Sequence, residues 1–339
     1  MKGIRRFRDD VIVARLLGNK MTAAIASPHA ADSDPLIAHY TDAEAVIEIL
    51  KTGVLWASDA RYLNDLAEVE YGRSLVREIL AARMDDADET ERARCETLLA
   101  ETRETFTFSL PLVTCFSRSI DSLGQWRGYG AGRMRFALEF DEAALREIIA
   151  EQHFQLAECE YELEQQTSML EALVDDELSR WTAGRRPQGV GRLMRLDALR
   201  RRYPGYDEAM NEIWRSKTGE ITKEHADVLR QIPSGWTNYQ WELSRLLMLL
   251  KHPSFYAERE IRAIKEQDDG DLMFRGTERA IVPFTELRFR SGNERGALRA
   301  VRVGPGIDFT DVQPVVSRLL FQTHYDGVTI ERSNCTFRG

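Results

Sequence analysis

Apolar residues recur along this chain with the spacing of a strand in some segments and of a helix in others. Residues 36–40 predict a short strand. The helix predicted after it carries one apolar stripe, at Ala43, Val46, Ile47 and Leu50. Thr41 with Glu44 three residues later predicts a capping box at the start of this helix, and Gly53 stands where its C-terminal cap belongs. With a second strand over residues 54–58, the pattern predicts a strand–helix–strand unit.

The rest of the chain divides into a helical middle and a strand-rich end. Residues 65–82 and 87–104 predict two helices, and helical patterns dominate residues 141–251, with one possible strand at 155–161. A further helix is expected around residues 311–324. Short runs rich in β-branched and aromatic residues predict the remaining strands, over 113–117, 134–140, 260–265, 280–284, 298–303 and 327–331. These elements predict an α+β fold.

The positions of the strands set the expected domain organisation. Residues 1–35 show no strong period, and their second half is rich in Ala, Ser, Asp and Pro, which indicates a flexible N-terminal tail. The strands on both sides of the helical middle would have to share one sheet. We therefore expect a single α+β domain over residues 36–339, with residues 141–250 as a mainly helical insertion.

Composition narrows the class of protein. The 339 residues are 43% hydrophobic and 30% charged, which is typical of a folded globular protein and excludes wholesale disorder. The 46 basic and 55 acidic residues give a net charge of −9, so the chain is a poor candidate for a nonspecific nucleic-acid coat. The four cysteines include no CxxC pair, which argues against a zinc ribbon or a disulfide framework. Because the longest uncharged run, residues 105–117, is too short for a membrane helix and the basic start leads into Asp9 and Asp10, we expect a cytoplasmic protein.

The end of the first predicted strand holds one candidate group, His39-Tyr40-Thr41. Side chains alternate along a strand, so Ile37, His39 and Thr41 are expected on one face and Tyr40 on the other. A polar histidine on an apolar strand can orient a ligand hydroxyl. The plainer interpretation is a core histidine that hydrogen-bonds a backbone carbonyl.

A second candidate group is Glu258, Glu260 and Arg262, which alternation places on one face of a predicted strand. Three charged groups on one face need a reason, because burying an unpaired charge is costly. One interpretation is a surface strand with a Glu–Arg pair. The other is a carboxylate in a cleft, which Arg262 keeps ionised.

Aromatic residues mark a third group. Ser117 begins a polar stretch that leads to Trp126 and Tyr129, and two aromatics three apart beside glycines could stack on a planar ring. Aromatics at this spacing also occur as ordinary core residues. A further polar group is Asn64 and Asp65, with Glu68 close behind; Asn and Asp are natural helix caps and turn formers, so the plainer interpretation of this group is a turn.

Basic residues cluster in one segment of this acidic chain. Seven arginines and a single acid, Asp197, lie between positions 185 and 202: Arg185, Arg186, Arg192, Arg195, Arg200, Arg201 and Arg202. Such a run could hold a phosphorylated partner or RNA, or form a solvated helix face.

Classical catalytic motifs are absent from the sequence. It contains no P-loop, no GxGxxG after a strand, no HExxH and no GxSxG. Cys115 and His39 could act as nucleophile and base, but Cys115 lies in an apolar strand, where cysteine is usually inert.

Taken in order, these motifs resemble the uncharacterised bacterial family called domain of unknown function 2971. The matching residues are His39-Tyr40-Thr41, Leu55-Trp56-Ala57-Ser58, Leu63-Asn64-Asp65 with Glu68, Cys115-Phe116-Ser117 with Trp126 and Tyr129, Glu258 to Arg262, and the ending Ile330, Ser333, Phe337 and Arg338. The resemblance spans residues 36–338. The chain departs from it at Phe337, where the family has Tyr, and at Leu66, where Pro is common.

The same order of a first-strand His, a later aromatic and a late-strand Glu is similar to the His-Tyr-Glu pattern of ADP-ribosyltransferases. That resemblance implies an ADP-ribosyltransferase-like mixed β core with a helical insertion, and NAD as the substrate. It implies that His39 holds a ribose hydroxyl, that Tyr129 or Trp126 stacks on nicotinamide, and that Glu260 or Glu258 stabilises an oxocarbenium-like transition state. The implied contacts to the rest of NAD are Tyr40, Thr41, Ser58, Asn64, Ser117, Arg262, Ser333 and Arg338.

Three functions follow as expectations. The first is transfer of ADP-ribose from NAD to a protein or nucleic-acid acceptor near the arginine run, or hydrolysis of NAD, without a metal. A bacterial family of this kind implies a role in phage defence or toxin systems. The second is a nucleotide-binding or sensor module without turnover. The third is a nuclease or nucleic-acid binder, which rests on the arginine run alone.

Overall fold

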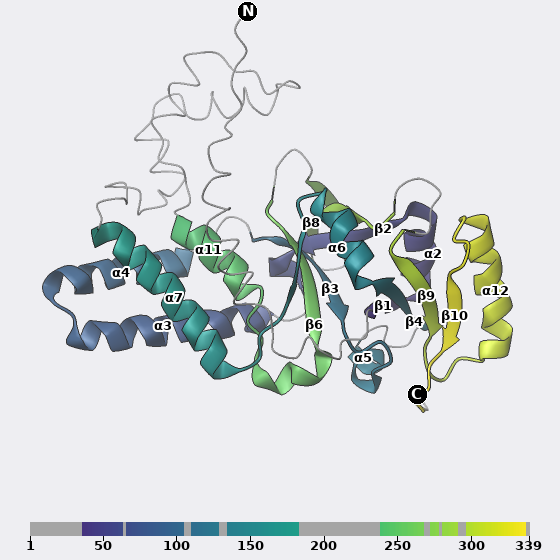
Figure 1. Cartoon of the computed structure of the whole chain (residues 1–339), viewed down its shortest axis with the longest axis horizontal. Helices are drawn as coiled ribbons and strands as arrows, with labels where there is room; N and C mark the ends of the chain where they lie inside the picture. Colours follow the sequence, from purple (N-terminus) through teal and green to yellow (C-terminus); the bar gives the residue numbers. More distant parts are fainter. Residues whose placement is uncertain are drawn as a thin grey trace, which may run out of the picture. The chain divides into compact units, whose positions relative to one another are not determined.

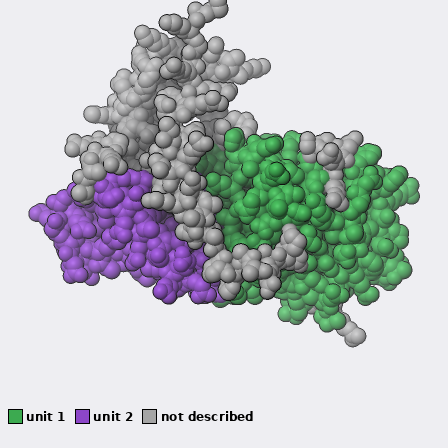
Figure 2. Space-filling model, viewed as in Figure 1, with its two compact units in different colours: residues 1–59, 112–159, 254–339 green, residues 60–111, 160–253 purple. Residues whose placement is uncertain are grey.

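The structure is a computed structural model that describes residues 36–63, 66–104, 110–128, 134–182, 238–267, 272–277, 280–290 and 296–336 (Figure 1). By their contacts these residues belong to two compact units (Figure 2). The sheet unit comprises residues 1–59, 112–159 and 254–339, and the helical unit comprises residues 60–111 and 160–253. The tail predicted for residues 1–35 lies outside the described residues, and the single domain expected over 36–339 stays a prediction.

The sheet unit contains one mixed sheet, which confirms the predicted α+β class. Its strands are β1 (Leu36–Asp42), β2 (Val54–Asp59), β3 (Leu112–Ser117), β4 (Arg135–Asp141), β5 (Gln155–Glu158), β6 (Glu260–Lys265), β7 (Met273–Gly276), β8 (Ile281–Arg288), β9 (Leu298–Val303) and β10 (Thr329–Arg332). The order is β10-β9-β4-β1-β3-β2-β8-β7, while β6 pairs with β3 and β5 pairs with β6. Only the β9–β10 pair is parallel among the described strands.

The predicted strand–helix–strand opening is present, but its helix begins one residue later than the capping box implies. Helix α2 (Ala43–Thr52) has Asp42 as its N-cap, and the Asp42 carboxylate accepts a hydrogen bond from the backbone N–H of Ala45. Thr41 remains in β1, because it pairs with Phe136 on β4. Gly53 ends the helix as predicted, with a left-handed φ of 71°.

The two faces of the sheet differ in chemistry. Helices α2, α6 (Glu142–Ala150) and α12 (Phe309–Gln322) cover an apolar face whose buried side chains include Ile37, Phe116, Leu138, Phe140 and Ile261. The alternate residues of the same strands form the opposite face, which we call the polar face. From β1 to β10 it carries Tyr40, Ser58, Cys115, Ser117, Glu139, Glu260, Arg262, Arg302 and Glu331.

The helical unit contains α3 (Leu66–Asp86), α4 (Glu89–Glu104), α7 (Leu163–Thr182) and α11 (Asn238–Leu247), with the short η1 (Ala60–Tyr62). The helices predicted over 65–82 and 87–104 are therefore confirmed. A buried ion pair joins α3 to the segment after α11, because Lys251 Nζ lies 3.0 Å from Glu68 Oε1. The Tyr71 hydroxyl donates to Gln166 Oε1 at 2.6 Å, and the Gln166 amide donates to the Lys251 carbonyl at 2.8 Å. Glu68 thus contributes to the interior of this unit.

Candidate functional site

The centre of the polar face is a buried ion pair on β6. Arg262 donates from Nε to Glu260 Oε1 at 2.7 Å and from Nη2 to Glu260 Oε2 at 3.1 Å. The side chains of Arg262 and Glu260 are only 4% and 8% exposed, respectively. A bidentate arginine–carboxylate pair fixes the orientation of both groups and keeps the carboxylate charged. The prediction that Glu260 and Arg262 share one face is confirmed.

Glu258 does not continue this row, so the prediction of three charged groups on one strand face is wrong. Glu258 ends the short helix η2 (Pro253–Glu258), and Arg259 has a left-handed φ of 44° that breaks the alternation before β6 begins. The Glu258 carbonyl accepts a hydrogen bond from Ser117 Oγ at 2.6 Å.

Residues of β3 and β1 lie beside the pair on one side of β6. Ser117 lies opposite Glu260 on β6 and opposite Ala38 on β1, while Cys115 lies opposite Arg262. Burial, reinforced by the charge of Glu260, raises the pKa of the Cys115 thiol well above its ordinary value. A protonated thiol is a poor nucleophile, so the burial of Cys115 argues against it as the attacking group.

His39 lies on the apolar face. Its Nδ1 is 2.9 Å from the Cys115 carbonyl, and its ring meets the Phe116 ring edge to face with centroids 5.9 Å apart. Burial lowers the pKa of His39, which keeps the imidazole neutral. This is the plainer interpretation of His39, a core histidine bonded to a backbone carbonyl. Thr41 lies on the same side of β1 by alternation.

The strand register therefore separates the histidine from the glutamate. Ala38, Ser117 and Glu260 are directly opposite one another across β1, β3 and β6, so they share the polar face. His39, one residue on from Ala38, points the other way. The His-Tyr-Glu pattern implies that His39 and Glu260 share one site. The structure instead places them on opposite faces of the sheet. On β1, Tyr40 lies on the same side as Ala38 and so shares the polar face with Glu260.

Trp126 is part of the packing on this face. It lies on α5 (Leu123–Gly128), its side chain is 1% exposed, and it meets the Tyr40 ring edge to face with centroids 4.8 Å apart. The Tyr40 hydroxyl in turn accepts from the Ser122 N–H at 3.0 Å and donates to the Ser119 carbonyl. Burial raises the pKa of Tyr40, so the phenol stays neutral. With this burial Trp126 offers no open ring on which nicotinamide could stack.

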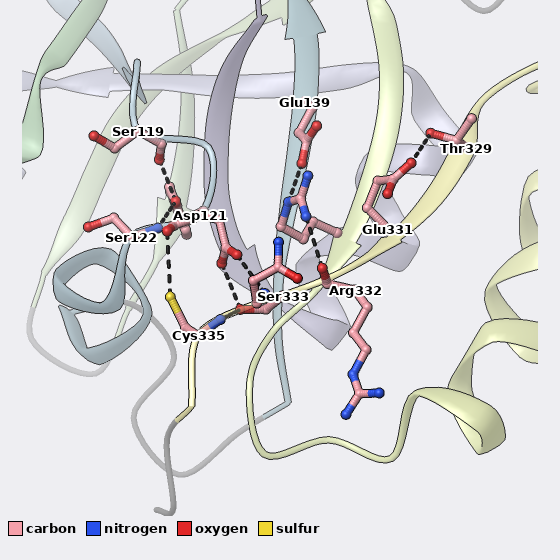
Figure 3. Close-up of polar contacts among 12 residues, drawn as sticks. Ser119, Asp121, Ser122, Glu139, Thr329, Glu331, Arg332, Ser333 and Cys335 are labelled. Carbon is pink, nitrogen blue, oxygen red and sulfur yellow. Dashed lines mark hydrogen bonds and ion pairs between the residues drawn. The ribbon is translucent and has the colours of Figure 1, made fainter.

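Asp121 joins these elements to the end of the chain (Figure 3). Its carboxylate accepts from Trp126 Nε1 at 2.7 Å, from Ser333 Oγ at 2.6 Å and from the Asn334 N–H at 2.7 Å. The Ser333 hydroxyl group therefore donates its hydrogen bond to Asp121 in this structure. Beside it, Arg302 donates from Nε to Glu139 at 2.5 Å, forming a second buried ion pair.

We expect Asp121 to make stability depend on pH. Burial alone would raise the pKa of its carboxyl group, but the hydrogen bonds from Ser333, Trp126 and Asn334 lower it below its ordinary value. A lowered pKa stabilises the folded state above the ordinary carboxyl pKa, and that stability is lost as the pH falls through the lowered value. Wild type should thus be more stable than Asp121→Asn at pH 7, with the difference shrinking below about pH 4.

Urea denaturation at pH 7, 5, 4 and 3 measures this difference. The control is Asp311→Asn, which removes an exposed carboxylate from the first turn of α12. A gap between wild type and Asp121→Asn that stays constant over this range would contradict the role given to Asp121.

Ser58 lies at the other end of the polar face. It is opposite Val113 on β3 and Phe284 on β8, and it is 7% exposed. Val113 precedes Ser117 by four residues, so Ser58 is about 13 Å from the Glu260 row along β3.

Several predicted residues lie outside the described residues. They are Asn64, Tyr129, Arg338 and the arginine run from Arg185 to Arg202. Their roles stay predictions. Among the residues that the structure does describe, no cluster of three His, Cys, Asp or Glu side chains could hold a metal ion.

Two features of the polar face were not predicted from the sequence, the Glu139–Arg302 pair and the central position of Asp121. A signal for the first was available: Glu139 stands between Leu138 and Phe140 in β4, and Arg302 stands between Val301 and Val303 in β9, so each is a charged residue flanked by apolar neighbours. All four cysteines are free thiols. In the described part of the chain, no helix has the length and apolar character that crossing a membrane requires.

Comparison with known proteins gives one match. The model of a family described as "Protein of unknown function (DUF2971)" matches residues 125–263, a span that runs from α5 into β6 and includes Trp126, Glu260 and Arg262. No curated protein and no solved structure matches the chain. The resemblance to this family predicted over residues 36–338 is thus confirmed over residues 125–263, where the chain is similar to DUF2971.

Proposed function

We propose that the polar face binds NAD and that Glu260 assists cleavage of the bond between ribose and nicotinamide. The observation that carries the proposal is the buried Glu260 carboxylate, oriented through both oxygens by Arg262 and flanked by Ser117. Cleavage of a glycosidic bond with a good leaving group needs a placed, ionised carboxylate more than it needs a strong nucleophile. The proposed function is therefore ADP-ribosyl transfer to a macromolecular acceptor, or NAD hydrolysis.

The proposed reaction needs no reactant besides NAD and either water or the acceptor. The bond between the anomeric carbon and the pyridinium nitrogen breaks, and nicotinamide leaves as a neutral molecule with the electron pair. Glu260 stabilises the positive charge that develops on the sugar, while Arg262 acts as a positioning residue. An oxygen of water or of the acceptor then bonds to the anomeric carbon and releases its proton.

One observation favours a second function, nucleotide binding without turnover. Both oxygens of Glu260 already receive hydrogen bonds from Arg262, and the side chain is 8% exposed. A carboxylate engaged in this way also serves simply to neutralise Arg262 within the sheet. The two functions share ligand binding and differ in the release of nicotinamide.

The test is to incubate the purified full chain with NAD and to measure free nicotinamide by chromatography. We expect release by wild type and a fall of about 100-fold or more in Glu260→Gln, in line with the loss of an electrostatic catalytic group. The control is Glu331→Gln, which changes another carboxylate of the polar face, one that accepts from Thr329 Oγ1. Melting curves must show that both variants are folded.

The results of this experiment distinguish NAD cleavage from nucleotide binding without turnover. Equal rates in wild type and Glu260→Gln would remove Glu260 from the reaction. No release, together with a higher melting temperature in NAD, would favour binding without turnover. No release and no thermal shift would refute both functions.

A further inference from the structure

Three side chains at the β2 end of the polar face form a group that the proposed reaction does not use. Trp56 and Ser58 lie on β2, and Arg275 lies on the edge strand β7. Arg275 donates from Nη2 to Ser58 Oγ at 3.0 Å, and its guanidinium carbon lies 4.8 Å from the centre of the Trp56 ring. Trp56 and Ser58 belong to the Leu-Trp-Ala-Ser motif at residues 55–58, in which Ser58 alone was expected to contact NAD.

Arg275 differs from the buried arginines of the same sheet. Arg262 is paired with Glu260 and Arg302 with Glu139. Arg275 has no ion pair with any described carboxylate, and its buried Nε has no hydrogen-bond partner within the described part of the chain. Burial also lowers the pKa of this guanidinium. Removing a charge from water without a counter-charge is costly, so a site of this kind favours an anion.

The acidic side chain of the neighbouring strand β8 is already engaged. Glu286 lies opposite Trp56 across β2 and β8, but its carboxylate forms an ion pair with the exposed Arg288. Glu286 therefore does not neutralise the charge of Arg275.

We propose that Trp56, Ser58 and Arg275 form a binding site for the phosphate group of a nucleotide. Arginine N–H groups match phosphate oxygens in geometry and charge. Ser58 Oγ accepts from Arg275, which leaves its own proton to donate to a phosphate oxygen. The indole of Trp56 is 51% exposed and provides a flat apolar surface for the base or sugar. The site does not include Glu260 and does not depend on cleavage of NAD.

The experiment is isothermal titration of the full chain with AMP, with adenosine and with inorganic phosphate. AMP carries no nicotinamide, so its binding is independent of the proposed reaction. We expect AMP to bind, phosphate to bind at least tenfold more weakly, and adenosine to give no measurable binding at the same concentrations. Arg275→Gln should weaken AMP binding at least tenfold, and Trp56→Ala should weaken it by a smaller factor.

The matched control is Arg288→Gln, which removes the same charge from the neighbouring strand at a residue that already has a carboxylate partner. It should leave AMP binding unchanged, and melting curves must show that every variant is folded. Absence of AMP binding at millimolar concentration overturns the proposal, as does equal affinity in wild type and Arg275→Gln. Equal affinities for AMP and phosphate would overturn the assignment to a nucleotide.

Discussion

Replacing Glu260 with alanine is expected to lower the free energy of unfolding by about 3–5 kcal/mol, because the substitution leaves Arg262 buried without its counter-charge. Both partners are more than nine-tenths buried, and their two hydrogen bonds measure 2.7 and 3.1 Å. Arg262→Ala should have an effect of the same size, since it leaves the carboxylate buried instead. Urea denaturation followed by circular dichroism measures both.

The double variant Glu260→Leu with Arg262→Met tests the cause. Replacing a whole buried ion pair with apolar residues of similar volume is often neutral, so most of the lost stability should return. A double variant as unstable as Glu260→Ala would show that the loss comes from packing. The double variant also tests the proposed function, because a folded protein without the carboxylate should release nicotinamide about 100-fold or more slowly than wild type if Glu260 is the catalytic group.

Local pattern predicted much of the sheet. Alternation correctly put Glu260 with Arg262, and the i, i+3, i+4, i+7 stripe correctly gave α2. The helix boundary was misplaced by one residue because Thr41 and Asp42 are both good caps, and pairing with β4 keeps Thr41 extended. Strand β7 was not predicted, since its four residues are largely exposed and show no apolar alternation.

The relation between distant strands could not be predicted in the same way. Alternation shows that His39 and Tyr40 point to opposite faces of β1, but only the pairing of Ala38 with Ser117 decides which of them joins Glu260. A shift of one residue in that register would reverse the result. The hydrogen bond from Ser333 to Asp121 joins residues 212 positions apart, and no local spacing encodes it.

The second large effect is expected at Trp126, which packs in the interior of the structure, whereas the resemblance to ADP-ribosyltransferases implies that it stacks on nicotinamide. Trp126→Ala should cost about 3–5 kcal/mol of unfolding free energy, because it removes a large side chain that is 1% exposed and packs on Tyr40. Trp126→Phe retains most of this packing and loses the hydrogen bond to Asp121, so it should cost about 1.5–3 kcal/mol.

Trp56→Ala is the matched control, because the same truncation at a side chain that is 51% exposed should cost less than Trp126→Ala. All three variants are measured by urea denaturation, and the two Trp126 variants are also measured with NAD; Trp56→Ala serves as a control for stability alone, because Trp56 lies in the proposed nucleotide site. If Trp126 is a packing residue, stability falls in the order given and NAD stabilises the folded Trp126→Phe variant as much as wild type. If Trp126→Ala were as stable as wild type and lost only the NAD shift, Trp126 would be a ligand platform, and the packing role derived from its contacts with Tyr40 and Asp121 would be wrong.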